Sequence, residues 1–176
     1  VIAAKLLTVT GIEVSDKVYD GSNTATLGTN NAVLVGVVGA EDVALSTTNA
    51  TGAFASRNVG AGMTVQVSGL ELYGTDIGNY ALTQPSTNAS ISQLAITVTA
   101  VADSKVYDGT TSSTGVPTVS PGLGSGDTAN FAQAFDTKNT GTGKTLAPSG
   151  SVTDGNGGAN YAVTFASATT GEITAK

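Results

Sequence analysis

One five-residue motif, Lys-Val-Tyr-Asp-Gly, occurs twice in the chain, at residues 17–21 and again at residues 105–109. The two copies lie 88 positions apart (105 − 17) in a chain of 176 residues. Similarity at a fixed spacing is the signature of a structural unit that is repeated along a sequence. The motif therefore restricts the chain to folds in which one small unit occurs twice.

Other segments match in the same order, so the duplication extends through most of the chain. Residues 2–10 are similar to residues 91–99, and the Asn-Tyr pair at residues 79–80 recurs at residues 160–161. Copy 1 has extra residues between its motif and the Asn-Tyr pair, as is typical of insertions in surface loops. We interpret the chain as two copies of one module, joined end to end.

The spacing of apolar residues indicates strands and not helices. Apolar and polar residues alternate at residues 7–9 and 96–98, which is the period of a half-buried strand. Asp-Gly pairs and short glycine clusters supply turns between such segments. We therefore expect an all-β fold with little or no helix, built as two small β-sandwich modules of immunoglobulin-like type in line, at residues 1–93 and 94–176. A β-grasp-like module is the alternative, since residues 39–45 could form one short helix.

The composition limits the classes of function. The chain has no His and no Cys, so it lacks the commonest general base, the commonest metal ligand and any disulfide framework. Its net charge of −6 repels the phosphates of nucleic acids. No apolar run is long enough to cross a bilayer. We expect a monomer that is not an enzyme, binds no nucleic acid and does not insert into a membrane.

Turn chemistry explains each residue of the repeated motif. Val and Tyr end a strand, Asp-Gly forms the turn, and the Tyr ring packs while its hydroxyl bonds to a neighbouring backbone group. We therefore predict structural roles, and no catalytic or cofactor-binding role, for the motif and the Asn-Tyr pairs. These residues are Lys17, Tyr19, Asp20, Gly21, Asn79 and Tyr80 in copy 1, and Lys105, Tyr107, Asp108, Gly109, Asn160 and Tyr161 in copy 2.

Two features remain as candidates for binding. Asp154 and Asn156 have the spacing of oxygen ligands at the start of a calcium loop, although the bidentate acid that completes such a loop is missing. Calcium is therefore the one candidate cofactor. Tyr73 does not recur in copy 2, so it is a candidate for contact with a ligand, together with the insertion at residues 30–39.

The residues quoted above resemble tandem YDG-type repeats, which are named for the Tyr-Asp-Gly of this motif. In that family the motif precedes a glycine-rich middle, an Asn-Tyr pair and a closing strand that begins like Ile173-Thr174. Such repeats occur in large bacterial adhesins similar to filamentous haemagglutinin. The resemblance implies a secreted or cell-surface location, associated with the outer membrane, and neighbouring repeats of the same chain as partners.

The resemblance also implies a function. A stalk or spacer that supports cell adhesion or biofilm formation is the leading expectation. A module that itself recognises carbohydrate or a host or matrix protein is the alternative, with Tyr73 as the contact residue.

Overall fold

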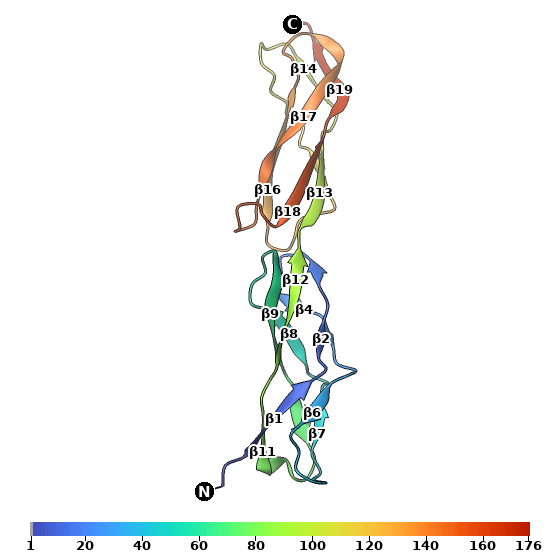
Figure 1. The fold of residues 1–176 in the computed structure, drawn as a ribbon. Helices are drawn as coiled ribbons and strands as arrows, with labels where there is room; N and C mark the ends of the chain where they lie inside the picture. The colour runs from blue at the N-terminus through green and yellow to red at the C-terminus, as the bar shows by residue number, and fades with distance from the viewer. Residues whose placement is uncertain (1) are drawn as a thin grey trace. The chain divides into compact units, whose positions relative to one another are not determined.

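The computed structural model describes residues 2–176, which fall into two compact units (Figure 1). Unit 1 is Val1–Val18 with Ser22–Ser92, and unit 2 is Tyr19–Gly21 with Gln93–Lys176. The prediction of an all-β fold is confirmed. The only helical element in the described part of the chain is one 3-10 turn, η1 (Ile77–Asn79).

Residues 39–45, the candidate helix of a β-grasp-like module, instead form a turn that leads into a strand. Among residues 2–176, no helix is long and apolar enough to cross a membrane.

Unit 1 is built from twelve mostly short strands in several small sheets. One sheet has the order β3-β12-β9-β8-β4, another has the order β11-β1-β6, and two further pairs are β10-β7 and β2-β5. The strands are β1 (Lys5–Thr10), β2 (Glu13–Val14), β3 (Lys17–Val18), β4 (Thr24–Ala25), β5 (Leu27–Gly28), β6 (Val33–Val35), β7 (Ala44–Ser46), β8 (Thr51–Phe54), β9 (Gly60–Ser68), β10 (Glu71–Tyr73), β11 (Tyr80–Leu82) and β12 (Ser86–Ser92).

Alternation of side chains explains how these strands enclose a core. Successive residues of a strand face opposite sides of the sheet, so every second side chain can be buried. β1 buries Leu7 and Val9 in this way, and β9 buries Val65 and Val67. Val9 and Val67 then belong to one apolar cluster with the buried Leu70.

Unit 2 repeats the main strand pairings of unit 1 in two sheets. One sheet has the order β14-β19-β17-β16 and the other has the order β15-β13-β18. Its core contains Ala100, Phe135, Leu146 and Ile173. The strands are β13 (Leu94–Thr99), β14 (Asp103–Val106), β15 (Thr118–Ser120), β16 (Thr128–Phe135), β17 (Gly141–Thr153), β18 (Tyr161–Ala166) and β19 (Ala168–Thr174).

Parallel pairing between an early and a late strand is common to both units. In unit 1, β3 pairs with β12 in parallel, so that Lys17 faces Ile91. In unit 2, β14 pairs with β19 in parallel, so that Lys105 faces Ile173. The first strand of each unit also pairs in parallel with the strand that begins at the Asn-Tyr tyrosine, β1 with β11 and β13 with β18. The repeated sequence therefore produces a repeated topology.

Candidate functional site

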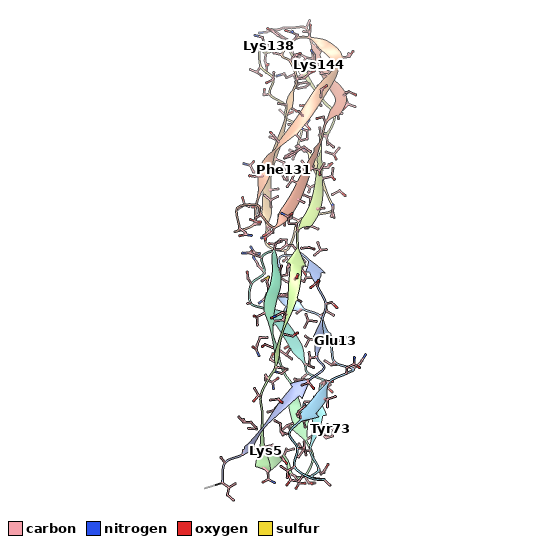
Figure 2. All side chains as sticks on the ribbon, in the orientation of Figure 1. Lys5, Glu13, Tyr73, Phe131, Lys138 and Lys144 are labelled. Carbon is pink, nitrogen blue, oxygen red and sulfur yellow. The ribbon has the colours of Figure 1, made fainter. Side chains whose placement is uncertain are left out.

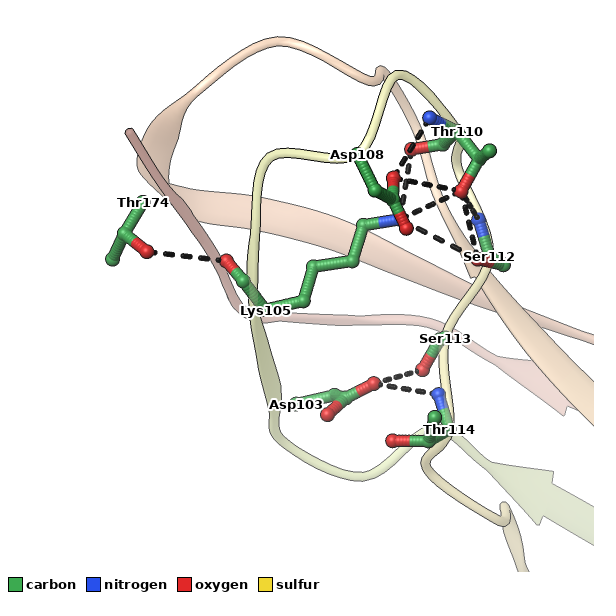
Figure 3. A network of polar contacts seen from close by, with 8 residues as sticks. All are labelled: Asp103, Lys105, Asp108, Thr110, Ser112, Ser113, Thr114 and Thr174. Atoms are coloured by element: carbon green, nitrogen blue, oxygen red, sulfur yellow. Dashed lines mark hydrogen bonds and ion pairs between the residues drawn. The ribbon is translucent and has the colours of Figure 1, made fainter. Parts of the chain in front are cut away.

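In copy 2 the Lys-Val-Tyr-Asp-Gly motif forms a turn that its own lysine stabilises (Figure 3). Lys105 lies in β14, and its ammonium group donates to the Asp108 carboxylate and to the Thr110 carbonyl, both at 2.9 Å. The Thr110 N–H donates to the same carboxylate oxygen at 2.9 Å. The hydrogen bond from Lys105, followed by that from Thr110, lowers the pKa of Asp108 from 3.8 to about 2. The charged residues of the motif thus stabilise the loop that follows it.

The lysine of copy 1 makes corresponding contacts. The Lys17 ammonium group donates to the carbonyl and to the hydroxyl of Ser22, both at 3.0 Å. It also lies 5.9 Å from the centre of the Phe54 ring, while the Lys105 ammonium lies 5.5 Å from the centre of the Phe135 ring. A cation above an aromatic face is attracted by the ring quadrupole. Both lysines therefore connect a polar loop to a buried aromatic residue.

The tyrosine of the Asn-Tyr pair makes two hydrogen bonds in unit 2. The backbone N–H of Gly124 donates to the Tyr161 hydroxyl oxygen at 2.8 Å, and that hydroxyl donates to the Asp127 carboxylate at 2.6 Å. Burial, followed by the hydrogen bond to Asp127, raises the pKa of Tyr161 above its ordinary value. The hydroxyl therefore keeps its proton and acts as a donor near neutral pH.

Unit 1 has the same arrangement around Tyr80. The backbone N–H of Val38 donates to the Tyr80 hydroxyl oxygen at 2.9 Å, and the hydroxyl donates to the carboxylate of Glu41. The acid again lies three residues after the N–H donor. The hydrogen bond to Glu41, followed by burial, raises the pKa of Tyr80. The two Asn-Tyr tyrosines therefore have the same hydrogen-bonding role.

The first Tyr-Asp-Gly turn belongs to unit 2 and adds Tyr19 to the hydrogen-bonded group of Gly124, Asp127 and Tyr161. The Tyr19 hydroxyl donates to the Asp127 carboxylate at 2.8 Å, and the Tyr19 and Tyr161 rings meet edge to face with centres 5.5 Å apart. The Ser125 N–H donates to the Asp20 carbonyl at 2.8 Å. Tyr19 is only 1% exposed. This tyrosine is therefore part of a packed core.

The second Tyr-Asp-Gly turn has the same backbone but a different environment. Gly21 and Gly109 have φ angles of +84° and +78°, a region that favours glycine. Tyr107, in contrast to Tyr19, is 38% exposed. Identical local sequence thus gives the same turn, while the surroundings decide whether the tyrosine is covered.

A buried aspartate organises the loop before Tyr161. Asp154 is 1% exposed, and its carboxylate accepts the backbone N–H groups of Asn156, Gly158 and Asn160 at 2.7 to 3.1 Å. Burial alone would raise the pKa of Asp154, but these three N–H groups outweigh it and lower the pKa. Asn160 is fully buried, and its side-chain oxygen accepts a hydrogen bond from the Asn156 amide. Asn79, at the matching place in unit 1, is exposed.

The calcium candidates lie in this loop. The Asp154 oxygens accept backbone N–H groups, and the Asn156 side chain donates to Asn160. Within residues 2–176, no three or more acidic, His or Cys side chains are grouped so that they could hold a metal ion. Calcium binding stays a prediction that these contacts do not support.

Tyr73, the candidate for contact with a ligand, lies on β10 (Figure 2). It is 58% exposed and faces Ala44 of β7 in the pairing of the two strands. Unit 2 has an exposed aromatic residue of its own, Phe165, whose ring meets the Phe131 ring edge to face at 6.0 Å. The two units therefore present different aromatic side chains to solvent.

Sequence reasoning missed the two acids, Glu41 and Asp127. Each is recognisable only through its partner tyrosine, which lies 39 residues away in unit 1 and 34 residues away in unit 2. One signal in the sequence could have identified them: in each copy the acid lies three residues after the residue whose backbone N–H donates to the tyrosine, Val38 before Glu41 and Gly124 before Asp127. Extra residues in copy 1 conceal this correspondence.

Comparison with protein families agrees with the repeated geometry. The family model described as the YDG domain matches residues 3–89 and 92–170. The chain belongs to the YDG domain family. No curated protein and no solved structure is similar enough to match the chain.

Each YDG segment contains one Tyr-Asp-Gly turn and one Asn-Tyr pair. The hydrogen-bonded groups of Lys105 with Asp108 and of Tyr19 with Asp127 involve the Tyr-Asp-Gly turns, and those of Tyr80 and Tyr161 involve the Asn-Tyr pairs. In this YDG chain these groups stabilise the fold, because their carboxylates, hydroxyls and ammonium groups form hydrogen bonds with one another and with the backbone. Tyr73 and Phe165 lie outside these networks.

Proposed function

We propose that the chain is a structural spacer of a bacterial cell-surface or secreted adhesin, in which YDG repeats support cell adhesion or biofilm formation. A spacer of this kind must resist extension without performing chemistry. The observation that carries the proposal is the parallel pairing of an early with a late strand, β3 with β12 and β14 with β19.

Parallel pairing determines how a unit carries a pulling force. When force is applied through Gln93 and Lys176, the ends of the main segment of unit 2, the start of β13 is pulled one way and the end of β19 the other, and the parallel β13–β18 and β14–β19 ladders lie between these two points. Parallel strands pulled in opposite directions are loaded in shear, so their hydrogen bonds share the force. Six residue pairs, from Leu94 with Tyr161 to Thr99 with Ala166, lie in the β13–β18 ladder, and four lie in the β14–β19 ladder. The pairing therefore suits a unit that carries tension without disulfides.

Single-molecule pulling in two directions tests the mechanical role. Pulling through the chain ends should load the parallel β13–β18 and β14–β19 ladders in shear. Pulling through cysteines placed at Thr128 and Thr153, which face each other at the open end of the β16–β17 hairpin, should open that ladder one pair at a time. The chain has no native Cys, so these attachment points are unique.

We expect unit 2 to unfold at a clearly higher force through the ends than through the hairpin. Equal forces in the two directions would contradict the mechanical role. Antibody labelling of intact cells of the source bacterium tests the proposed surface location separately.

A second candidate function rests on Tyr73. Exposed tyrosine rings are favoured at contact surfaces, because one end is apolar and the other forms hydrogen bonds. Tyr73 has 58% of its surface exposed and lies outside the hydrogen-bond networks of the repeated motif. Recognition of carbohydrate or of a host or matrix protein would be indicated by glycan-array or matrix-protein binding that is lost in Tyr73→Ala.

A further inference from the structure

Unit 1 contains a cavity of about 340 Å³ next to Tyr80. Its lining includes Ile2, Lys5, Val38, Glu41, Asn79 and Tyr80. Lys5 marks this region in Figure 2. The lining therefore includes the hydrogen-bonded group of unit 1, in which Val38 and Glu41 contact the Tyr80 hydroxyl. We name this cavity the tyrosine socket.

The matching place in unit 2 is filled. Gly124, Asp127 and Tyr161 make the contacts there that Val38, Glu41 and Tyr80 make in unit 1, and they surround the ring of Tyr19. Tyr19 supplies a second hydroxyl to the oxygen of Asp127 that already accepts the Tyr161 hydroxyl. The contacts of Tyr19 in unit 2 thus indicate which kind of group the socket of unit 1 can hold.

We propose that the tyrosine socket binds the Tyr-Asp-Gly turn of another YDG domain, and that Tyr107-Asp108-Gly109 of a second copy of this chain occupies it. The inference goes beyond the proposed function, because it names a partner and holds even if the chain carries no mechanical load. In this complex the Tyr107 hydroxyl donates to Glu41, and its ring packs edge to face against Tyr80.

The second turn is suited to be the occupant. Tyr107 is 38% exposed, whereas Tyr19, the same residue of the first turn, is buried. The contacts among Lys105, Asp108 and Thr110 hold the backbone of the turn in place. A preorganised turn loses little conformational freedom when it binds.

One difference between the site around Tyr19 in unit 2 and the tyrosine socket of unit 1 predicts how tightly the socket binds a turn. A Cβ atom on Gly124 would lie 3.0 Å from atoms of Tyr19, Asp20 and Gly21, so the filled site leaves no room for a side chain there. The socket has Val38 at this position. Its side chain narrows the socket, and association between separate wild-type chains is therefore weak. Replacing Val38 by Gly should strengthen it, because overpacking opposes binding.

The contact joins different surfaces of the two chains, so it is heterologous and can continue from one chain to the next. A domain linked in the same chain would reach the socket at a much higher effective concentration than a free chain. A test with free chains is consequently more demanding than a test with linked domains, because the effective concentration of the turn is lower.

NMR titration with separate donor and acceptor chains tests the proposal. The acceptor is an isotope-labelled chain with Tyr107→Ala, which keeps the socket but cannot donate a tyrosine, and it is prepared both with Val38 and with Val38→Gly. The donor is the unlabelled wild-type chain. Donors with Tyr107→Ala, Tyr107→Phe and Tyr73→Ala complete the set, the last being a matched control that removes a different exposed tyrosine.

We expect wild-type donor to shift the amide signals of Glu41, Gly78 and Tyr80, with binding about tenfold tighter for the Val38→Gly acceptor. Tyr107→Phe should weaken binding about fivefold through loss of the hydroxyl, Tyr107→Ala should abolish it, and Tyr73→Ala should leave it unchanged. Well-dispersed amide spectra of each variant verify folding.

Three results would overturn the proposal. These are equal shifts from the Tyr107→Ala donor, shifts that lie outside the socket, and an absence of binding to the Val38→Gly acceptor. None of them bears on the force that unit 2 withstands, so failure here and failure of the proposed function are distinguishable.

Discussion

Tyr19 and Tyr161 donate their hydroxyl groups to the same oxygen of Asp127, at 2.8 and 2.6 Å. Their rings also meet edge to face with an angle of 75° between the planes. The two tyrosines come from the two motifs that recur in this chain, Tyr-Asp-Gly and Asn-Tyr. The Asp127 carboxylate therefore connects the two motifs.

Substitution of Gly124 should loosen this hydrogen-bonded group. The residue has no side chain, and a Cβ atom there would lie 3.0 Å from three atoms of the turn that contains Tyr19. We expect Gly124→Val to lower the free energy of unfolding of unit 2 by about 2 kcal/mol, the usual cost of overpacking. Hydrogen exchange of the backbone amide of Ser125, which donates to Asp20, should become faster. Urea denaturation and hydrogen exchange measure the two effects.

Gly122→Val is the matched control, because a Cβ atom at Gly122 has nothing within 4 Å. The same substitution two residues away should leave stability nearly unchanged. An equal loss of stability in both variants would show that the valine acts on the loop itself and not on the fit of the turn.

Acidification should destabilise unit 2 partly through Asp154. Its pKa is lowered in the folded chain, so its carboxylate contributes stability that is present above the unfolded pKa of about 3.9 and is lost as the pH falls through the lower, folded pKa. We expect Asp154→Asn to reduce the loss of stability that occurs when the pH falls below about 4. Urea denaturation at a series of pH values measures this dependence.

Glu71→Gln, an exposed substitution on β10 of unit 1, is the control for the pH series. It should leave the dependence on pH of unit 2 as in the wild-type chain. If the Asp154→Asn chain loses as much stability below pH 4 as the wild type does, then Asp154 is not a source of the acid sensitivity.

Removal of the Lys105 ammonium should release the turn at Asp108. Lys105→Met keeps an apolar stem but removes the donor to Asp108 and Thr110. Since the hydrogen bond from Lys105 is the main cause of the lowered pKa, the pKa of Asp108 should rise from about 2 toward 3.8. NMR titration of the Asp108 carboxyl group measures the change. Lys138→Met, at an exposed position in the same unit, should not alter it.

The sequence was sufficient to predict the all-β fold, because alternation in β1, β9 and β13 is strong and local. It was less informative where pairing with a neighbour decides the structure. Residues 151–153 have a weak strand pattern, yet they form the end of β17 because β16 continues alongside them to Thr128. Tertiary pairing here overrides local preference.

The same distinction applies to the candidate site. The Asp-Gly turn chemistry at residues 20–21 and 108–109 is local, so the positive φ of each glycine follows from the motif. The burial of Tyr19 and the exposure of Tyr107 depend on what lies opposite the turn. No pattern within five residues carries that information.

The membership of Tyr19–Gly21 in unit 2 has a practical consequence for anyone who expresses a single repeat. A fragment cut at residues 92–170, where the family model places the second domain, would lack Tyr19. It would also lose Ile173, a core residue that is 1% exposed. The segment that the family model matches and the compact unit of structure are thus offset along the chain, and cloning boundaries should follow the latter.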